Sequence, residues 1–278
     1  MAVWPRVLLA LSIPCAAAVA GAQPGTESGA GSPRAFALAK VITGEASVAP
    51  AQGPEAWRRA AEGGDRNAQA MLGSMYCLGQ DVPRDLGQAL FWYRKAAEGG
   101  DPQAQAILGL MLEDGAGAAR ASQEAAGWLR KAADQGNAAA QARLGEKYLD
   151  GDGVAQDPAA ARRWLRAAVE QGDAGAQAKL GALCYLGQGQ PRDPGEALKW
   201  LRLASAQGDA SAQGCLGVMY ALGDGVPRDE VEGYAWLLRA RSGGDAMAAD
   251  AVGAVEATLT PAQREAGRRH AERLNSQP

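Results

Sequence analysis

The chain has 278 residues, 28 basic against 31 acidic side chains and a formal net charge of −3. A nucleic-acid-binding surface needs clustered lysine and arginine to displace counterions, and the absence of any basic block argues against that class. Alanine and leucine supply most of the apolar content, β-branched residues are few, and only two phenylalanines occur. This composition predicts an all-α fold.

Residues 1–22 have the pattern of a secretory signal peptide. Arg6 supplies the charged start, residues 7–19 form an apolar run, and small residues allow cleavage after Ala20 or Ala22. The run is too short for a membrane-spanning helix. We therefore expect a periplasmic or secreted protein that is not inserted in a membrane after the signal is removed.

One cysteine bears on how the protein is exported, and the other three bear on its redox state. Cys15 raises a lipoprotein alternative, but Pro14 does not fit a lipobox, which favours soluble export. The mature chain keeps Cys77, Cys184 and Cys215, an odd number, so at least one thiol is free or paired between molecules. There is no CxxC motif, and we interpret the three as small buried hydrophobic residues rather than a redox site.

Residues 23–52 are rich in Gly, Ala, Ser and Pro, which is typical of a flexible linker. Within this linker, Ala35 to Val41 is a candidate for one short helical turn. Residues 53–278 form the remaining segment, and this is where the sequence repeats.

The repeat has a period of 36 residues, which is visible in four independent series. A period of this size indicates small units stacked in one dimension. One series is Trp92, Trp128, Trp164, Trp200 and Trp236. A second is Gln69, Gln105, Gln141, Gln177 and Gln213. The others are the Leu-Gly pairs that begin at Leu72 and the Gly-Asp or Gly-Asn pairs that begin at Gly64.

Each unit is predicted to contain two helices. The first, in "DRNAQAMLGSMYCLG", places Ala68, Leu72 and Met75 on one face at helical spacing. The second, in "DLGQALFWYRKAAEGG", does the same with Ala89 and Trp92. A Gly-Gly or Gln-Gly pair suits the end of the second helix, and the following Asp or Asn suits the N-cap of the next.

The motifs "AQxxLGxxY…G" and "GxGVPRD…AxxWxxxAAxxG" resemble the Sel-one-like repeat (SLR) family, a relative of the tetratricopeptide repeats. The resemblance implies an α/α solenoid, a right-handed superhelix of helix-turn-helix repeats, over residues 53–278. Five full units begin near Asp65, Asp101, Asn137, Asp173 and Asp209. A half unit with Trp57 precedes them as a candidate N-terminal cap, and the degenerate "DAMAADAVGAV" follows them.

The last stretch departs from the repeat and predicts a closing helix. Thr260 as N-cap, Pro261 at the first helical position and Gln263 three residues after the N-cap form a capping box. A polar outer side would let this helix cover the apolar end of the stack.

The segment "LDGDGVAQD" (149–157) looks like a calcium loop but does not match one. With Asp150 as the first position of an EF-hand, the fifth is Val154 and the twelfth Ala161, so two required ligands are missing. We interpret the segment as an inter-helix turn. Glycines recur in this turn at 79, 115, 151, 187 and 223. Aspartates at 85, 157, 193 and 229 are the predicted N-caps, with Ser122 as the substitute in the second unit.

The sequence offers no catalytic, cofactor-binding or metal-binding arrangement, so we expect a protein that is not an enzyme. The only histidine, His270, is interpreted as a solvated position of the terminal helix, and no zinc cluster or His relay can be built around it. SxxK, P-loop and dinucleotide motifs are absent. A hydrolase acting on cell-wall or β-lactam substrates stays as the alternative.

The resemblance to tetratricopeptide arrays implies that the first helices line a concave binding surface. Helical phase gives the candidate partner-binding residues Ser74, Leu110, Glu113, Asp114, Glu146, Leu149, Asp150, Ala182, Tyr185 and Val218. The middle of this row is acidic and its C-terminal part apolar. The row predicts a partner segment with a basic centre and an apolar flank; the alternative is that the acids are ordinary solvated charges.

We therefore predict an exported monomer that binds another protein and has no chemistry of its own. Proteins that resemble it act as regulators of sensor kinases, envelope-assembly adaptors or immunity proteins against secreted toxins. No cofactor is expected.

Overall fold

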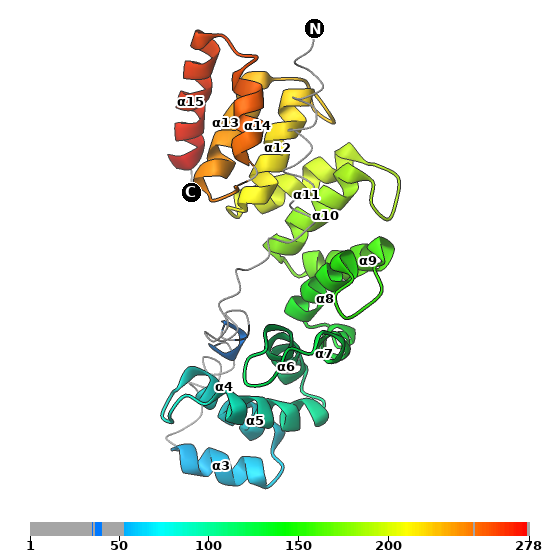
Figure 1. Ribbon diagram of the computed structural model, residues 1–278, viewed down its shortest axis with the longest axis vertical. Helices are drawn as coiled ribbons and strands as arrows, with labels where there is room; N and C mark the ends of the chain where they lie inside the picture. The colour runs from blue at the N-terminus through cyan, green and yellow to red at the C-terminus, as the bar shows by residue number, and fades with distance from the viewer. Residues whose placement is uncertain (1–34, 36, 41–52, 247, 277–278) are drawn as a thin grey trace. The chain divides into compact units, whose positions relative to one another are not determined.

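The computed structural model of the chain describes residues 35, 37–40, 53–246 and 248–276. Within these residues every regular element is a helix, and no strand occurs (Figure 1). The all-α prediction is therefore confirmed for the described part of the chain. The predicted signal peptide and most of the predicted linker lie outside it.

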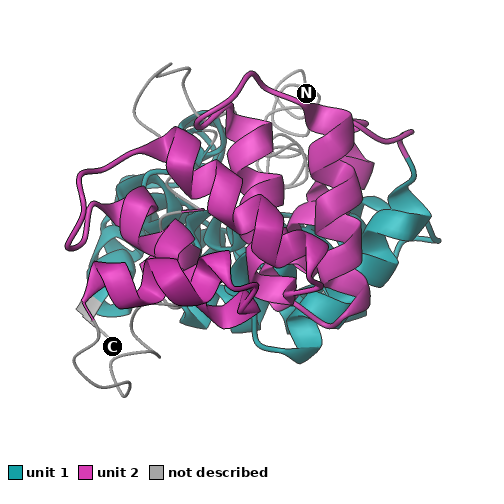
Figure 2. Ribbon diagram, turned by 90° about the horizontal axis from the view of Figure 1, so that it is seen from below, with its two compact units in different colours: residues 1–23, 157–278 teal, residues 24–156 magenta. Residues whose placement is uncertain are grey.

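The chain divides into two compact units, shown in different colours in Figure 2. Unit 2 ends at Gln156 and unit 1 contains everything from Asp157 onward. The described helices of unit 2 are α3 (Pro54–Glu62), α4 (Arg66–Leu78), α5 (Leu86–Glu98), α6 (Pro102–Asp114), α7 (Ser122–Asp134) and α8 (Ala138–Asp150). Those of unit 1 are α9 (Pro158–Glu170), α10 (Ala174–Leu186), α11 (Pro194–Ala206), α12 (Ala210–Leu222), α13 (Glu230–Ser242), α14 (Ala248–Glu256) and α15 (Pro261–Ser276).

Each helix from α4 to α13 is 13 residues long, so the 36-residue period is met by equal helices and equal turns. Within a unit, the first helix of a repeat packs on the second helix of the same repeat, as α4 does on α5 and α10 on α11. Each second helix also contacts the following first helix, as α5 does α6. This arrangement is the predicted stack of helical hairpins.

The predicted turn glycines adopt the left-handed conformation. Gly151 closes α8 with a φ of 72° and donates its backbone N–H to the carbonyl of Lys147. An L-residue pays a steric penalty in this region, which explains why glycine recurs here. Asp157 accepts hydrogen bonds from the backbone N–H groups of Ala159 and Ala160 at the start of α9. The interpretation of "LDGDGVAQD" as a turn with an N-cap is confirmed.

The predicted N-cap of α7 is wrong. Asp85, Asp193 and Asp229 cap their helices as expected, but the capping position of α7 is Ala121, which makes no side-chain cap hydrogen bond. Ser122 is the first residue inside α7, and its hydroxyl accepts a hydrogen bond from Arg120 instead. The hydroxyl of Ser122 lies one position after the N-cap, so no side chain caps this helix.

Close approach within each hairpin depends on the glycine of the Leu-Gly pair. A Cβ at Gly109 would lie 2.7 Å from Cγ of Leu129, and one at Gly217 would lie 2.6 Å from Cγ of Leu237. Both leucines are fully buried. The core of each unit therefore sits between first and second helices, where a large side chain of the second helix covers a glycine of the first.

The C-terminal helix closes unit 1 as predicted. The backbone N–H of Thr260 donates to the side chain of Gln263, and the N–H of Gln263 donates to the Thr260 hydroxyl, which is the expected capping box. Ala271 and Leu274 of α15 bury themselves against Ala235 of α13. No helix in the described ranges is long and apolar enough to cross a membrane.

Candidate functional site

The predicted partner-binding row is mostly not open to solvent. Two of its members, Asp114 and Asp150, are exposed, and Glu146 is half-buried. The buried members are Ser74, Leu110, Glu113, Leu149, Ala182, Tyr185 and Val218. This burial corrects the expectation of a continuous accessible floor at these seven positions. Their role in binding stays a prediction.

Ser74 shows why the helical phase was misjudged. Its hydroxyl lies 2.8 Å from the hydroxyl of Tyr93, on the second helix of the same hairpin, and 3.1 Å from the carbonyl of Ala70. The side chain therefore faces its own hairpin as much as the groove. Since one residue turns a helix by about 100°, a shift of one position moves a side chain from groove to core.

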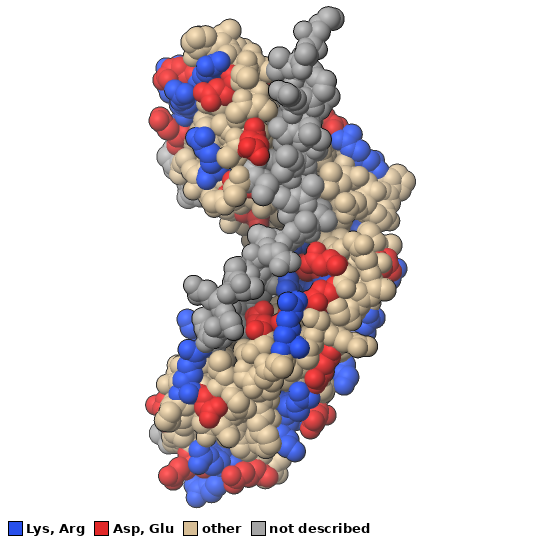
Figure 3. Space-filling model, in the orientation of Figure 1, with Lys and Arg blue, Asp and Glu red and all other residues tan. Residues whose placement is uncertain are grey.

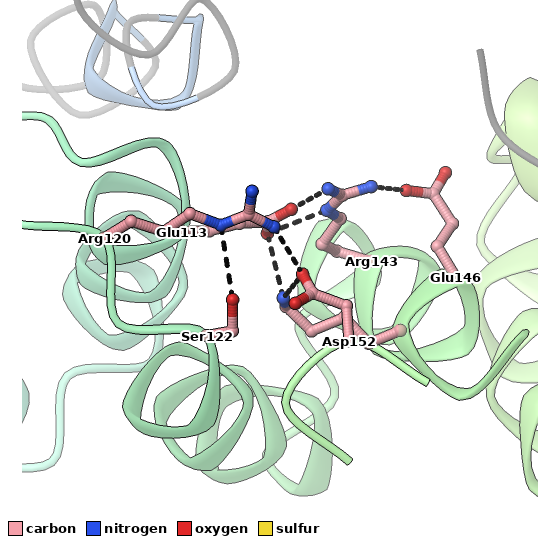
Figure 4. Close-up of polar contacts among 7 residues, drawn as sticks. Glu113, Arg120, Ser122, Arg143, Glu146 and Asp152 are labelled. Carbon is pink, nitrogen blue, oxygen red and sulfur yellow. Dashed lines mark hydrogen bonds and ion pairs between the residues drawn. The ribbon is translucent and has the colours of Figure 1, made fainter. Parts of the chain in front are cut away.

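A buried charged cluster joins α6 and α8 in unit 2 (Figure 4). Glu113 and Lys147 are at its centre, with exposed fractions of 4% and 1%, and their charged atoms lie 3.6 Å apart. Arg143 holds Glu113 through two contacts, one of them an Nε–Oε2 hydrogen bond of 2.8 Å, and also pairs with Glu146. Asp152 accepts from Lys147 at 2.9 Å and from Arg120 at 3.1 Å.

The repeat itself shows that this cluster is unusual. The residues equivalent to Lys147 in the other repeats are Met75, Met111, Leu183 and Met219. Burying a lysine costs desolvation free energy that burying a methionine does not. Since the other repeats form the same hairpin with Met or Leu at this position, the hairpin does not need a charge here to pack. Sequence reasoning missed both Lys147 and Arg143, although the break in this apolar series is visible in the aligned repeats.

Within the cluster, each acidic side chain is paired with at least one basic side chain. Burial opposes ionisation of Asp152, but hydrogen bonds from Lys147 and Ser122 and the positive charges of Lys147 and Arg120 lower its pKa to about 2. Burial lowers the pKa of Lys147, and the contact with Asp152 works against that shift. Glu113 and Glu146 are both paired with Arg143, so the acidic groove centre is largely neutralised. Acidic and basic side chains are also interspersed over the face seen in Figure 3.

Helix α8 differs from α4 and α6 in having partly exposed side chains at three repeat positions. The side chains of Arg143 and Glu146 are 20% and 14% exposed, and Ala142 is half-buried. The equivalent positions of α4 and α6 are all buried; they are Ala70, Met71 and Ser74 in α4, and Ala106, Ile107 and Leu110 in α6. Arg143 and Glu146 therefore form the one-turn charged pair that we call the α8 patch.

The surroundings of two cysteines and of the histidine are those of residues with a structural role. Burial raises the pKa of Cys77 to about 11 and that of Cys184 to about 12, which keeps both as neutral thiols. His270 is not simply solvated as expected: its Nε2 lies 2.8 Å from a carboxylate oxygen of Glu232. This contact lies between α15 and α13. Among the described residues, no group of three or more His, Cys, Asp or Glu is placed to hold a metal ion.

Equal helix pairs, a constant period and hairpins whose two helices meet at glycine–leucine contacts define an α/α repeat protein. More specifically, the chain belongs to the Sel1 repeat family. The Sel1 repeat model matches residues 66–101, 102–137, 138–173, 174–209 and 210–245, which are the five full units predicted from the sequence.

Two solved structures are similar over most of the chain. A Sel1 repeat protein from Oxalobacter formigenes is 28% identical, with 88% of this chain and 98% of that chain covered and a TM-score of 0.68. The protein c5321, a protective antigen of uropathogenic Escherichia coli with an SLR fold, is 31% identical, with 86% of this chain covered and a TM-score of 0.67. This chain spans 53% of the length of c5321. The search of curated proteins found no match.

Proposed function

We propose that the protein is a non-catalytic scaffold that binds another protein through the inner side of unit 2, with the α8 patch as its accessible charged part. Membership of the Sel1 repeat family supports protein binding, since proteins of this family are generally interaction scaffolds. The observation that carries the location is the pair Arg143 and Glu146. Both are partly exposed, at positions where α4 and α6 are buried.

The chemistry of the α8 patch revises the partner expected from the sequence. Arg143 and Glu146 lie one helical turn apart; the buried Glu113 holds Arg143, and Arg143 in turn pairs with Glu146, which leaves little freedom to either side chain. A preorganised pair of opposite charges selects a partner segment that carries both signs, rather than one with only a basic centre. Export to the periplasm or the outside is part of the proposal, and the signal-like residues 1–22 support it.

The test is capture of a partner from a periplasmic extract with the tagged full chain, compared with two charge-reversal variants. Arg143→Glu is expected to reduce capture at least tenfold. Lys95→Glu is the matched control, because Lys95 is exposed on a second helix of the same unit. Equal capture by wild type and Arg143→Glu would contradict this location. A regulator, an assembly adaptor and an immunity protein are distinguished by the captured protein, which would be a sensor kinase, an envelope component or a toxin.

The hydrolase alternative has a separate readout. Turnover of peptidoglycan fragments or β-lactams by the purified full chain, abolished by a single carboxylate substitution, would replace the scaffold proposal with an enzyme.

A further inference from the structure

A second charged cluster lies in unit 1, where Arg162 of α9 is buried. Arg162 is 7% exposed, and its Nη2 lies 3.3 Å from a carboxylate oxygen of Glu196 and 3.5 Å from the sulfur of Cys184. Its Nη1 is also buried but has no hydrogen-bond partner among the described residues. A buried guanidinium N–H group without an acceptor costs free energy, so Nη1 is a place where an additional acceptor would be stabilising.

The cluster holds more positive than negative charge. Arg166 of α9 also pairs with Glu196, through the other carboxylate oxygen, so two guanidinium groups share one carboxylate. Burial opposes the ionisation of Glu196, but hydrogen bonds from Cys184 and Trp200 and the charges of both arginines lower its pKa. Asp193, the preceding acid in the chain, caps the start of α11 instead. Among the described residues, one positive charge of the cluster therefore stays unmatched.

The same arrangement occurs 72 residues earlier in unit 2, but there the charges are matched. Arg94 pairs with Glu124 at 2.6 Å, and Trp128 donates its indole N–H to the same carboxylate. The residue equivalent to Arg162 is Leu90. The hairpin therefore forms without a charge at this position, and Arg162 is an addition to the cluster rather than a requirement of the fold.

We propose that Arg162, Arg166 and Glu196 form a binding site for a carboxylate group of another molecule, which we call the α9 site. The incoming carboxylate pairs with Arg166, whose side chain is 50% exposed, and Glu196 then turns both of its oxygens to Nη1 and Nη2 of Arg162. Each guanidinium thereby has its own carboxylate, in the bidentate geometry that arginine favours. The single unmatched charge fits a carboxylate better than a phosphate group, which carries more negative charge.

The α9 site lies in unit 1, so it goes beyond the proposed function, which places binding in unit 2. The carboxylate has two possible sources, a small molecule or an acidic side chain of a protein segment. The test therefore uses one probe for each source: sodium acetate and the blocked peptide acetyl-Ala-Glu-Ala-amide. Sodium chloride at the same ionic strength and acetyl-Ala-Gln-Ala-amide are the matched controls without a carboxylate.

Trp200 provides the readout, because its indole N–H donates at 3.4 Å to the oxygen of Glu196 that also contacts Arg166. Release of that oxygen changes the chemical shift of the indole N–H in ¹H–¹⁵N spectra of the labelled full chain. Trp128 is a control within the same molecule, because the charge of its partner Glu124 is already matched by one arginine.

In wild type, the Trp200 signal is expected to shift saturably with a carboxylate probe, whereas the Trp128 signal stays unchanged. Arg162→Leu copies Leu90 and should weaken binding about tenfold, since Glu196 then has no second guanidinium to move to. Glu196→Gln removes the resident carboxylate and should strengthen binding about tenfold, because the probe no longer competes with it.

Lys199→Gln separates the α9 site from a general attraction of anions. Lys199 lies 4.9 Å from the centre of the Trp200 ring, so this variant removes a nearby positive charge and keeps the three residues of the site. It should bind both probes with the affinity of wild type.

A response to acetate alone would assign the site to small carboxylates, and a response to the glutamate peptide alone would assign it to acidic protein segments; either result supports the site. No shift of the Trp200 signal with either probe would overturn the proposal. Equal affinity in wild type and Arg162→Leu would overturn it as well, and so would a loss in Lys199→Gln as large as that in Arg162→Leu.

Discussion

The last helix of unit 2 and the corresponding helices of unit 1 have the same backbone and opposite interiors. Helices α8, α10 and α12 are each 13 residues long, begin at an Asn or Asp N-cap and end at a left-handed glycine. Yet the position of Lys147 holds Leu183 in α10 and Met219 in α12. Caps and glycines therefore determine the hairpin, and the buried residue at the position of Lys147 is free to vary without changing it.

The contrast also separates stability from specificity. An apolar interior contributes burial free energy at every repeat, whereas the charged cluster of unit 2 has to offset the desolvation of Glu113 and Lys147. Charges retained at such a place fix the register of α6 against α8 and hold Arg143 in position. Substitutions in the cluster, in the turns and at the caps test this contrast, in order of decreasing effect.

The largest effect is expected from removing one member of the buried pair. Glu113→Leu leaves Lys147 and Arg143 with one carboxylate fewer, and the unfolding free energy of unit 2 should fall by about 3 kcal/mol. The double variant Glu113→Leu/Lys147→Met copies the apolar repeats and should return to within about 1 kcal/mol of wild type. Urea unfolding followed by circular dichroism measures both. A double variant as unstable as the single one would contradict the idea that the cluster adds specificity rather than stability.

The second effect concerns a glycine in the turn of unit 2. Gly117 has a φ of 83°, and a Cβ there would lie 2.3 Å from the backbone carbonyl oxygen of Leu86. Gly136 has a φ of 88°, but a Cβ there would meet nothing within 4 Å. Both alanine variants suffer the left-handed backbone penalty, so Gly117→Ala should cost about 2 kcal/mol more than Gly136→Ala. Equal thermal midpoints for the two variants would show that the turn can move away from α5.

The third prediction uses pH. The folded-state pKa of Asp152 is lowered from 3.8 to about 2. Its ionisation therefore stabilises unit 2 at any pH above the unfolded-state pKa, and this contribution is lost as the pH falls through about 2. Asp152→Asn should be less stable than wild type at pH 6, and the difference should shrink between pH 4 and pH 2. Unfolding curves at successive pH values provide the test. A constant difference would mean that the contacts with Lys147 and Arg120 do not depend on the charge of Asp152.

The smallest effect is a gain of stability at the uncapped helix. Ala121 occupies the N-cap of α7 without a side-chain hydrogen bond, whereas Asp85 and Asp193 cap α5 and α11. Ala121→Asp should stabilise the protein by about 1 kcal/mol. The control is Ala118→Asp, three residues earlier in the turn, which should leave the midpoint unchanged. No gain at position 121 would show that the turn before α7 cannot adopt the capping geometry.

The repeat made the hairpins predictable, because period, caps and turn glycines are local signals that recur five times. The inner surface was not predictable in the same way. Ser74 was assigned to the groove but faces Tyr93, since a phase error of one residue cannot be detected from a first helix that is apolar on most sides. The pairing of Arg143 with Glu113 depends on the register between successive repeats, which spacing alone does not determine.

The equal turns also have an evolutionary consequence. Each first helix between Arg66 and Leu222 starts and ends on the same kind of cap, so recombination that adds or removes one 36-residue unit joins compatible ends. Chain length can then change by whole units without a new fold having to be selected. Of the two similar structures, one has a matched length, with 98% of that chain covered, and one is considerably longer, with 53% covered.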